Sequence, residues 1–92
     1  MAEIEFDHRK NEINIAKHGI SLERAGDMEV LTLVGDQRFD YGEIRFRAFG
    51  YIDGLAYCFC FTDREGTRRV INLRRAHLKE MKQHVEDPKR VD

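Results

Sequence analysis

An Asp-Gly pair between two apolar, alternating segments restricts the fold more than any other feature of this chain. Asp53-Gly54 separates residues 44–51 from residues 55–62, and both segments are rich in aromatic residues. Such a pair is a strong local signal for a β-hairpin, because the two-residue turn needs positive φ angles that Asp and Gly tolerate. We therefore expect antiparallel strands from Ile44 to Tyr51 and from Leu55 to Thr62.

The second of these strands carries apolar or small side chains on both faces. Strict alternation places Leu55, Tyr57, Phe59 and Phe61 on one face, and Ala56, Cys58, Cys60 and Thr62 on the other. Both faces are therefore expected to be covered, so this strand should be the central one. Cys58 and Cys60 share a face of one strand, a geometry that suits a disulfide poorly, and both are expected to be reduced.

A third strand is predicted from Thr67 to Arg74, after a turn at residues 63–66. Alternation predicts one face with Ile71 and Leu73 and another with Val70, Asn72 and Arg74. Arg69 and Arg74 are five residues apart, so they are expected on opposite faces.

Helices are predicted on both sides of this three-stranded unit. After a short first strand around Ile4 and Phe6, Asp7 is a suitable cap for a helix from about His8 to His18, which Gly19 ends. A second helix is expected from about Ser21 to Leu31, and a third from Arg75 to Glu86, before Pro88. The third helix is expected to pack through a stripe of Leu78, Met81 and Val85. The order β-α-α-β-β-β-α predicts an α+β fold, a small antiparallel sheet with packed helices.

Bulk properties indicate one cytoplasmic domain over residues 1–92. A length of 92 residues with 41% hydrophobic content fits a single core. The apolar run at residues 55–61 is too short to cross a bilayer, and the acidic N-terminus is unlike a signal peptide.

Charge is distributed unevenly along the chain, although the net charge is only -1. Residues 1–43 contain five basic and ten acidic residues, a balance of -5, which leaves +4 for residues 44–92. From Arg64 to His84 there are seven basic residues and two acidic ones. This segment is where we expect a polyanion to bind.

The sequence lacks the usual signature of a metal site. Cys58-x-Cys60 stands alone, and His77 and His84 are seven residues apart on a predicted helix, about 10 Å along its axis. We therefore expect no metal and no cofactor.

Two groups of motifs together resemble the BrnT toxin family. The first comprises Ile4-Glu5-Phe6-Asp7, Lys10-Asn11, Asn14 and Lys17-His18-Gly19-Ile20-Ser21. The second comprises Arg45, Thr62-Asp63-Arg64, the segment from Arg69 to Ala76, and Glu80. The motifs cover nearly the whole chain in the order expected for that family. Two positions differ, since Asn72 replaces a usual serine and His84 replaces a common tyrosine.

The resemblance implies a RelE-like ribonuclease fold and a toxin of a type II toxin-antitoxin system. It also implies a BrnA-like antitoxin with a ribbon-helix-helix domain. That antitoxin would neutralise the toxin, and the complex would bind DNA only through the antitoxin, repressing the shared operon.

Basic side chains alone are able to catalyse RNA cleavage, because RNA carries its own nucleophile, the 2′-OH. Arg binds phosphate with a rigid fork of donors, while His and desolvated Lys transfer protons. The candidate catalytic residues are Lys17, Arg64, Arg74 and His84. The candidate RNA-binding residues are Arg69, Arg75, Lys79 and Lys82. His18 is interpreted instead as a cation that stabilises a helix end.

Two other classes of function stay open at this point. A non-catalytic RNA-binding module would use the same basic segment without turnover. A protein-interaction module would show no affinity for RNA at any salt concentration. The leading hypothesis is a metal-independent endoribonuclease.

Overall fold

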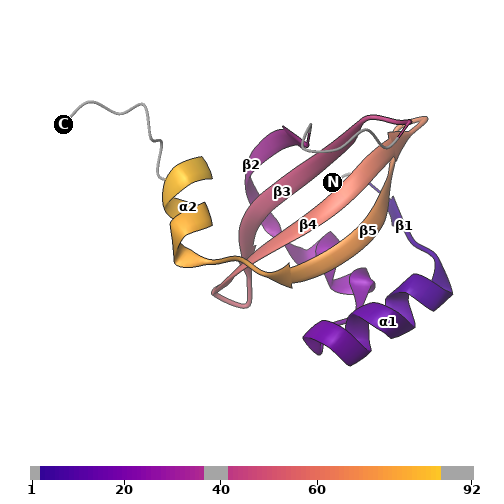
Figure 1. The fold of residues 1–92 in the computed structure, drawn as a ribbon, viewed down its shortest axis with the longest axis horizontal. Helices are drawn as coiled ribbons and strands as arrows, with labels where there is room; N and C mark the ends of the chain where they lie inside the picture. Colours follow the sequence, from indigo (N-terminus) through magenta and orange to yellow (C-terminus); the bar gives the residue numbers. More distant parts are fainter. Residues whose placement is uncertain (1–2, 37–41, 86–92) are drawn as a thin grey trace.

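A computed structural model describes residues 3–36 and 42–85 of the chain, which form an α+β fold (Figure 1). In chain order its elements are β1 (Ile4–Glu5), α1 (His8–His18), the 3-10 helix η1 (Leu22–Asp27), β2 (Glu29–Asp36), β3 (Arg45–Ile52), β4 (Leu55–Arg64), β5 (Thr67–Arg75) and α2 (Leu78–His84). The five strands form one sheet in the order β1-β5-β4-β3-β2. β1 is parallel to β5, and the other neighbours are antiparallel. The predicted hairpins are confirmed, and β4 is the central strand.

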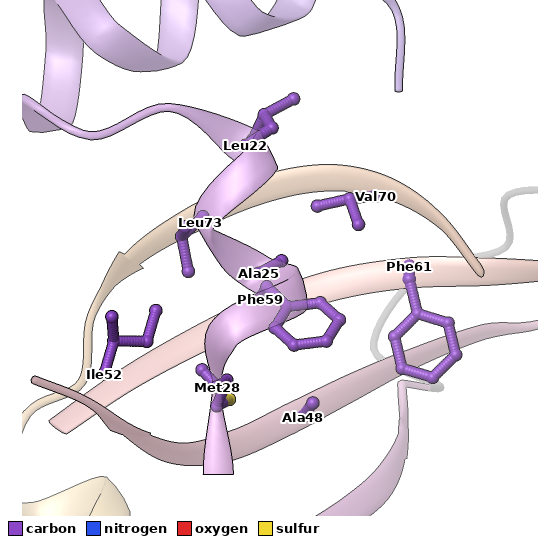
Figure 2. Packing of buried hydrophobic residues seen from close by; sticks show 9 residues of the cluster. All are labelled: Leu22, Ala25, Met28, Ala48, Ile52, Phe59, Phe61, Val70 and Leu73. Atoms are coloured by element: carbon purple, nitrogen blue, oxygen red, sulfur yellow. The ribbon is translucent and has the colours of Figure 1, made fainter. Parts of the chain in front are cut away.

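The main core lies on the face of the sheet that η1 covers, which we call the η1 face. Leu22 and Ala25 of η1 are buried against it (Figure 2). The sheet contributes six buried residues to this cluster: Ala48, Ile52, Phe59, Phe61, Val70 and Leu73. Ser21 is the N-cap of η1, and its Oγ accepts a hydrogen bond from the Glu23 N–H at 3.2 Å.

The opposite face is covered at one end by α2, and we call it the α2 face. There Met81 packs in a second cluster with Phe49, Cys58 and Ala76. The predicted alternation of β4 is therefore confirmed, because its aromatic residues line one face and its cysteines the other. Both cysteines are buried thiols that form no disulfide, as predicted.

Helix α1 is attached to the sheet by an asparagine rather than by an apolar stripe. Asn14 is 4% exposed, and its amide donates to the carbonyls of Ile20 and Leu73 at 3.0 and 2.8 Å. Its Oδ1 accepts from the Leu73 N–H at 3.1 Å. The Asn14 side chain thus forms the two hydrogen bonds with β5 that a peptide group of a neighbouring strand would form. Ile13 and Ile15 of α1 are exposed.

The predicted second helix is wrong beyond Asp27. The chain forms a single 3-10 segment and then extends as β2 along β3, so Leu31 lies in a strand. Gly50 makes this pairing possible, because a Cβ there would lie 2.8 Å from the carbonyl carbon of Glu29. Leu31 and Leu33 are exposed on this edge strand. The segment therefore has no buried apolar face that would have favoured a helix.

The predicted last helix starts too early, since Arg75 is the last residue of β5 and α2 begins at Leu78. The Ala76 N–H donates to the Ala56 carbonyl, which holds the chain beside β4 past the strand end. Leu78 is 69% exposed, so the predicted stripe is wrong at that position, while Met81 is buried and Val85 packs beside it. The predicted end at Glu86 and Pro88 lies outside the described residues.

A β-bulge in β5 overturns the strict alternation predicted for that strand. The register shifts between Cys60 and Phe61 of β4, so β5 has one residue more than its partner there. Val70 and Leu73 consequently share the η1 face instead of opposite faces. Arg69 and Arg74, expected on opposite faces, both lie on the α2 face.

Candidate functional site

Side chains cross the α2 face in rows, and α2 covers Cys58 and Phe49 of the first row. The cross-strand register gives three rows: Arg74, Cys58 and Phe49; then Asn72, Cys60 and Arg47; then Arg69 and Thr62. Neighbouring strands in a sheet are about 4.8 Å apart, so one row spans about 10 Å. This face is therefore wide enough for an RNA backbone and carries the donors to bind it.

Arg74 is held by a two-pronged ion pair with Glu80 of α2. Its Nη1 and Nη2 each donate to a different carboxylate oxygen at 2.8 Å. This pair lowers the pKa of Glu80 to about 2, more than burial raises it. The Glu80 carboxylate also accepts a hydrogen bond from the His77 N–H at 2.9 Å. The same carboxylate therefore caps the first turn of α2 and orients Arg74.

A groove of about 360 Å³ lies between α1 and β5, on the other side of Arg74. Its polar lining comprises Lys10, Asn14, Lys17, His18, Asn72 and Arg74. The pKa of His18 is lowered by burial first, and then by the charges of Lys17 and Arg74. The structure thus brings Lys17 and Arg74 together, and it adds His18, which sequence reasoning had given only a helix-end role.

His84 lies on the α2 face and stacks on Phe49, with ring centroids 4.7 Å apart and planes 22° from parallel. Its pKa is lowered by burial and by Arg47, while Glu80 acts in the opposite direction. The lowered pKa favours the neutral form of His84, which is able to accept a proton. It lies one helical turn from Glu80, which links it to Arg74.

Arg47 is a site residue that sequence reasoning missed. Its guanidinium carbon lies 5.5 Å from the centre of the Phe49 ring, on which His84 also stacks. Its Nε is buried without a hydrogen-bond partner. Alternation in β3 was the available signal, because Arg47 lies between Phe46 and Ala48 and must face away from the core that they enter.

The comparison with known protein families agrees with this geometry. Residues 6–80 match the family model described as ribonuclease toxin, BrnT, of type II toxin-antitoxin system. The chain belongs to the BrnT family. No curated protein matches it. The family is one of ribonuclease toxins, and a type II system implies an antitoxin partner. The match includes Lys17 and Arg74 and ends before His84.

The other predicted site residues lie around this BrnT site rather than in it. Arg69 is on the α2 face and 3.7 Å from the carboxylate of Glu5. Arg75 turns to the η1 face, where its guanidinium lies 5.5 Å from the Tyr57 ring centre. Lys79 and Lys82 are exposed on α2.

Arg64 is not brought to Arg74. It lies at the far end of β4, where it is 3.9 Å from the carboxylate of Glu43. It is six positions along β4 from Cys58, the partner of Arg74, a distance of about 20 Å.

Two further observations limit the kinds of site. Within residues 3–36 and 42–85, no group of three or more His, Cys, Asp or Glu side chains is arranged to hold a metal ion. No helix in the described part of the chain is long and apolar enough to span a membrane.

Proposed function

We propose that this chain is an endoribonuclease that cleaves RNA by attack of the 2′-OH, without a metal ion. The observation that carries the proposal is the position of Arg74. Arg74 lines the groove together with Lys17 and is paired with Glu80, one helical turn from His84. A phosphate bound to Arg74 would then have Lys17 as proton donor on the groove side and His84 as proton acceptor on the α2 side. In-line displacement at phosphorus needs such groups on two sides of the phosphate.

The proposed reaction needs only these side chains and the RNA itself. His84 takes the proton of the 2′-OH, the 2′-oxygen bonds to phosphorus, and the bond from phosphorus to the 5′-oxygen breaks. Lys17 donates a proton to the departing 5′-oxygen, leaving a 2′,3′-cyclic phosphate and a 5′-hydroxyl. Arg74 stabilises the negative charge that builds up on the phosphate oxygens.

We propose that the RNA continues from this site along basic side chains at its rim. Arg69 extends the α2 face beside Thr62. Lys79 and Lys82 are exposed on α2 and would contact neighbouring phosphates. Arg75 is exposed at the end of β5 but turned to the η1 face, so it would contact RNA only where the RNA passes around the end of the sheet. Arg64, about 20 Å away, would contact only a longer RNA.

We further propose that a BrnA-like ribbon-helix-helix antitoxin neutralises the chain by covering the Arg64 to His84 surface. That segment holds seven basic and two acidic residues, so an acidic partner segment would compete directly with RNA. DNA would be bound only through the antitoxin. Co-expression of the antitoxin should relieve growth arrest and block cleavage by the purified chain.

The decisive test compares two variants that both lack the Arg74–Glu80 ion pair. Glu80→Gln keeps the guanidinium, whereas Arg74→Met with Glu80→Gln removes it without leaving a buried carboxylate unpaired. We expect the double variant to cleave labelled RNA on the order of 10²-fold more slowly than the single variant, at a similar melting temperature. Equal rates would contradict the role of Arg74.

Excess EDTA tests the absence of a metal. We expect undiminished cleavage in EDTA and products that end in a cyclic phosphate, because the arginines supply the charge that a metal would bring. Cleavage that stops in EDTA and returns with magnesium, with 3′-hydroxyl ends, would contradict the mechanism. RNA binding without fragments from the wild-type chain would favour a non-catalytic binding module.

A further inference from the structure

Arg74, the cation proposed to stabilise the scissile phosphate, is already paired with a carboxylate. Arg74 and Glu80 form a close pair whose charges cancel, with side chains only 27% and 20% exposed. In the transition state of phosphodiester cleavage, the phosphorus centre carries more negative charge than the bound substrate. A second arginine without a carboxylate partner would stabilise this added charge.

We propose that Arg47 is this second catalytic arginine and that it binds the scissile phosphate of RNA from the β3 side. The proposal rests on the ribonuclease function proposed above. It adds a residue from a different strand and a different row of the α2 face.

The position of Arg47 brings it toward the reacting groups. It is opposite Cys60, one row from the Arg74, Cys58 and Phe49 row. Its guanidinium is directed along β3 to the Phe49 ring, where the ring of His84 also stacks. The proposed base and Arg47 are therefore held by one buried aromatic side chain.

The surroundings of Arg47 also indicate an anionic ligand. Carboxylates lie within 4 Å of three other basic residues of this face, Arg45, Arg69 and Arg74. No carboxylate of the described residues forms such a pair with Arg47. The buried Asp36 is opposite Arg45 in the register, and Val34 is opposite Arg47.

Burial makes this lack of a partner costly for the free protein. Arg47 is half-buried, and its Nε has no acceptor within the described structure. A buried guanidinium donor without an acceptor destabilises the folded protein. A phosphate oxygen would satisfy that donor and the charge together. We favour RNA over an acidic side chain of the antitoxin, because the proposed base lies beside the same ring.

The test compares Arg47→Met and Arg47→Lys with a matched control, Arg68→Met. Arg68 is also half-buried and lies 4.9 Å from a phenylalanine ring centre, that of Phe61, but on the η1 face. Each methionine variant removes one charge from above an aromatic ring. Three quantities are measured: cleavage rate, affinity for an RNA with 2′-deoxy sugars that cannot be cut, and melting temperature.

We expect Arg47→Met to lower kcat on the order of 10²-fold, with an unchanged or higher melting temperature. Arg47→Lys should restore part of the rate, and Arg68→Met should keep the wild-type rate. Because Arg47 lowers the pKa of His84, the acidic limb of the pH–rate profile should move to higher pH in Arg47→Met. The charges that face His84 are Arg47 from β3 and Glu80 from its own helix, and both remain in the control.

Three results would overturn the assignment. The first is an Arg47→Met variant that cleaves at the wild-type rate, and the second is one that loses rate only in proportion to a lower melting temperature. The third is one that cleaves normally but escapes inhibition by the antitoxin, which would make Arg47 a partner contact. A wild-type chain that cuts no RNA would instead overturn the proposed function itself, a result visible before any variant is compared.

Discussion

The ion pair between Arg74 and Glu80 makes a quantitative prediction about stability and pH. The pKa of Glu80 falls from 4.5 to about 2 in the folded chain. At 1.36 kcal/mol for each pKa unit, this corresponds to about 3 kcal/mol of stability. Because the folded pKa is the lower one, this stability is present above pH 4.5 and is lost as the pH falls toward 2.

Glu80→Gln should therefore be less stable than wild type by about 2–3 kcal/mol at pH 7, since glutamine keeps the shape but not the charge. For a domain of this size, that corresponds to a melting temperature lower by roughly 10 °C or more. Urea unfolding of both proteins at pH 7, 4 and 2.5 measures the difference. It should shrink steadily with falling pH.

A difference below about 1 kcal/mol at pH 7 would refute the reasoning, because the pair would then behave like an ordinary surface salt bridge. A difference that stays constant down to pH 2.5 would also refute it. In that case the lost stability would come from packing of α2 and not from the charge.

Three further predictions concern the sheet that carries the site. Asn14→Ala should destabilise the chain by about 3 kcal/mol in urea unfolding, because it leaves two buried backbone groups of Leu73 without partners. Gly50→Ala should cost about 1–3 kcal/mol through overlap with the β2 backbone, whereas Gly35→Ala, with open space around it, should be tolerated. Burial raises the pKa of the Cys58 thiol to about 11, so at pH 8 a thiol reagent should modify it slowly in the folded chain and rapidly in urea.

The elements that the sequence predicted well are those whose signals are local. The Asp53-Gly54 turn defined the β3–β4 hairpin, and the alternation of β4 gave its two buried faces. Asp7 and Gly19 defined both ends of α1, since capping depends only on neighbouring residues. These features also placed Lys17 in the last turn of that helix.

The elements that were predicted wrongly depend on distant contacts. β2 pairs with β3 across a connection, and its exposed leucines carried no clear period. The bulge in β5 is invisible in a sequence read by strict alternation, yet it decides that Arg69 and Arg74 share a face. Arg47 was missed for a related reason, since its importance comes from Phe49 and from a helix more than 30 residues later.

The pairing of Asn14 with Leu73 offers a way to observe site assembly without any RNA. The Leu73 N–H donates to the Asn14 side chain, so its hydrogen should exchange with deuterium only when α1 leaves the sheet. The same movement would open the groove that Lys17 lines with Arg74. The protection of this one amide therefore reports how often the groove is formed. An antitoxin that moved α1 away from the sheet would inactivate the chain without covering the basic surface from Arg64 to His84.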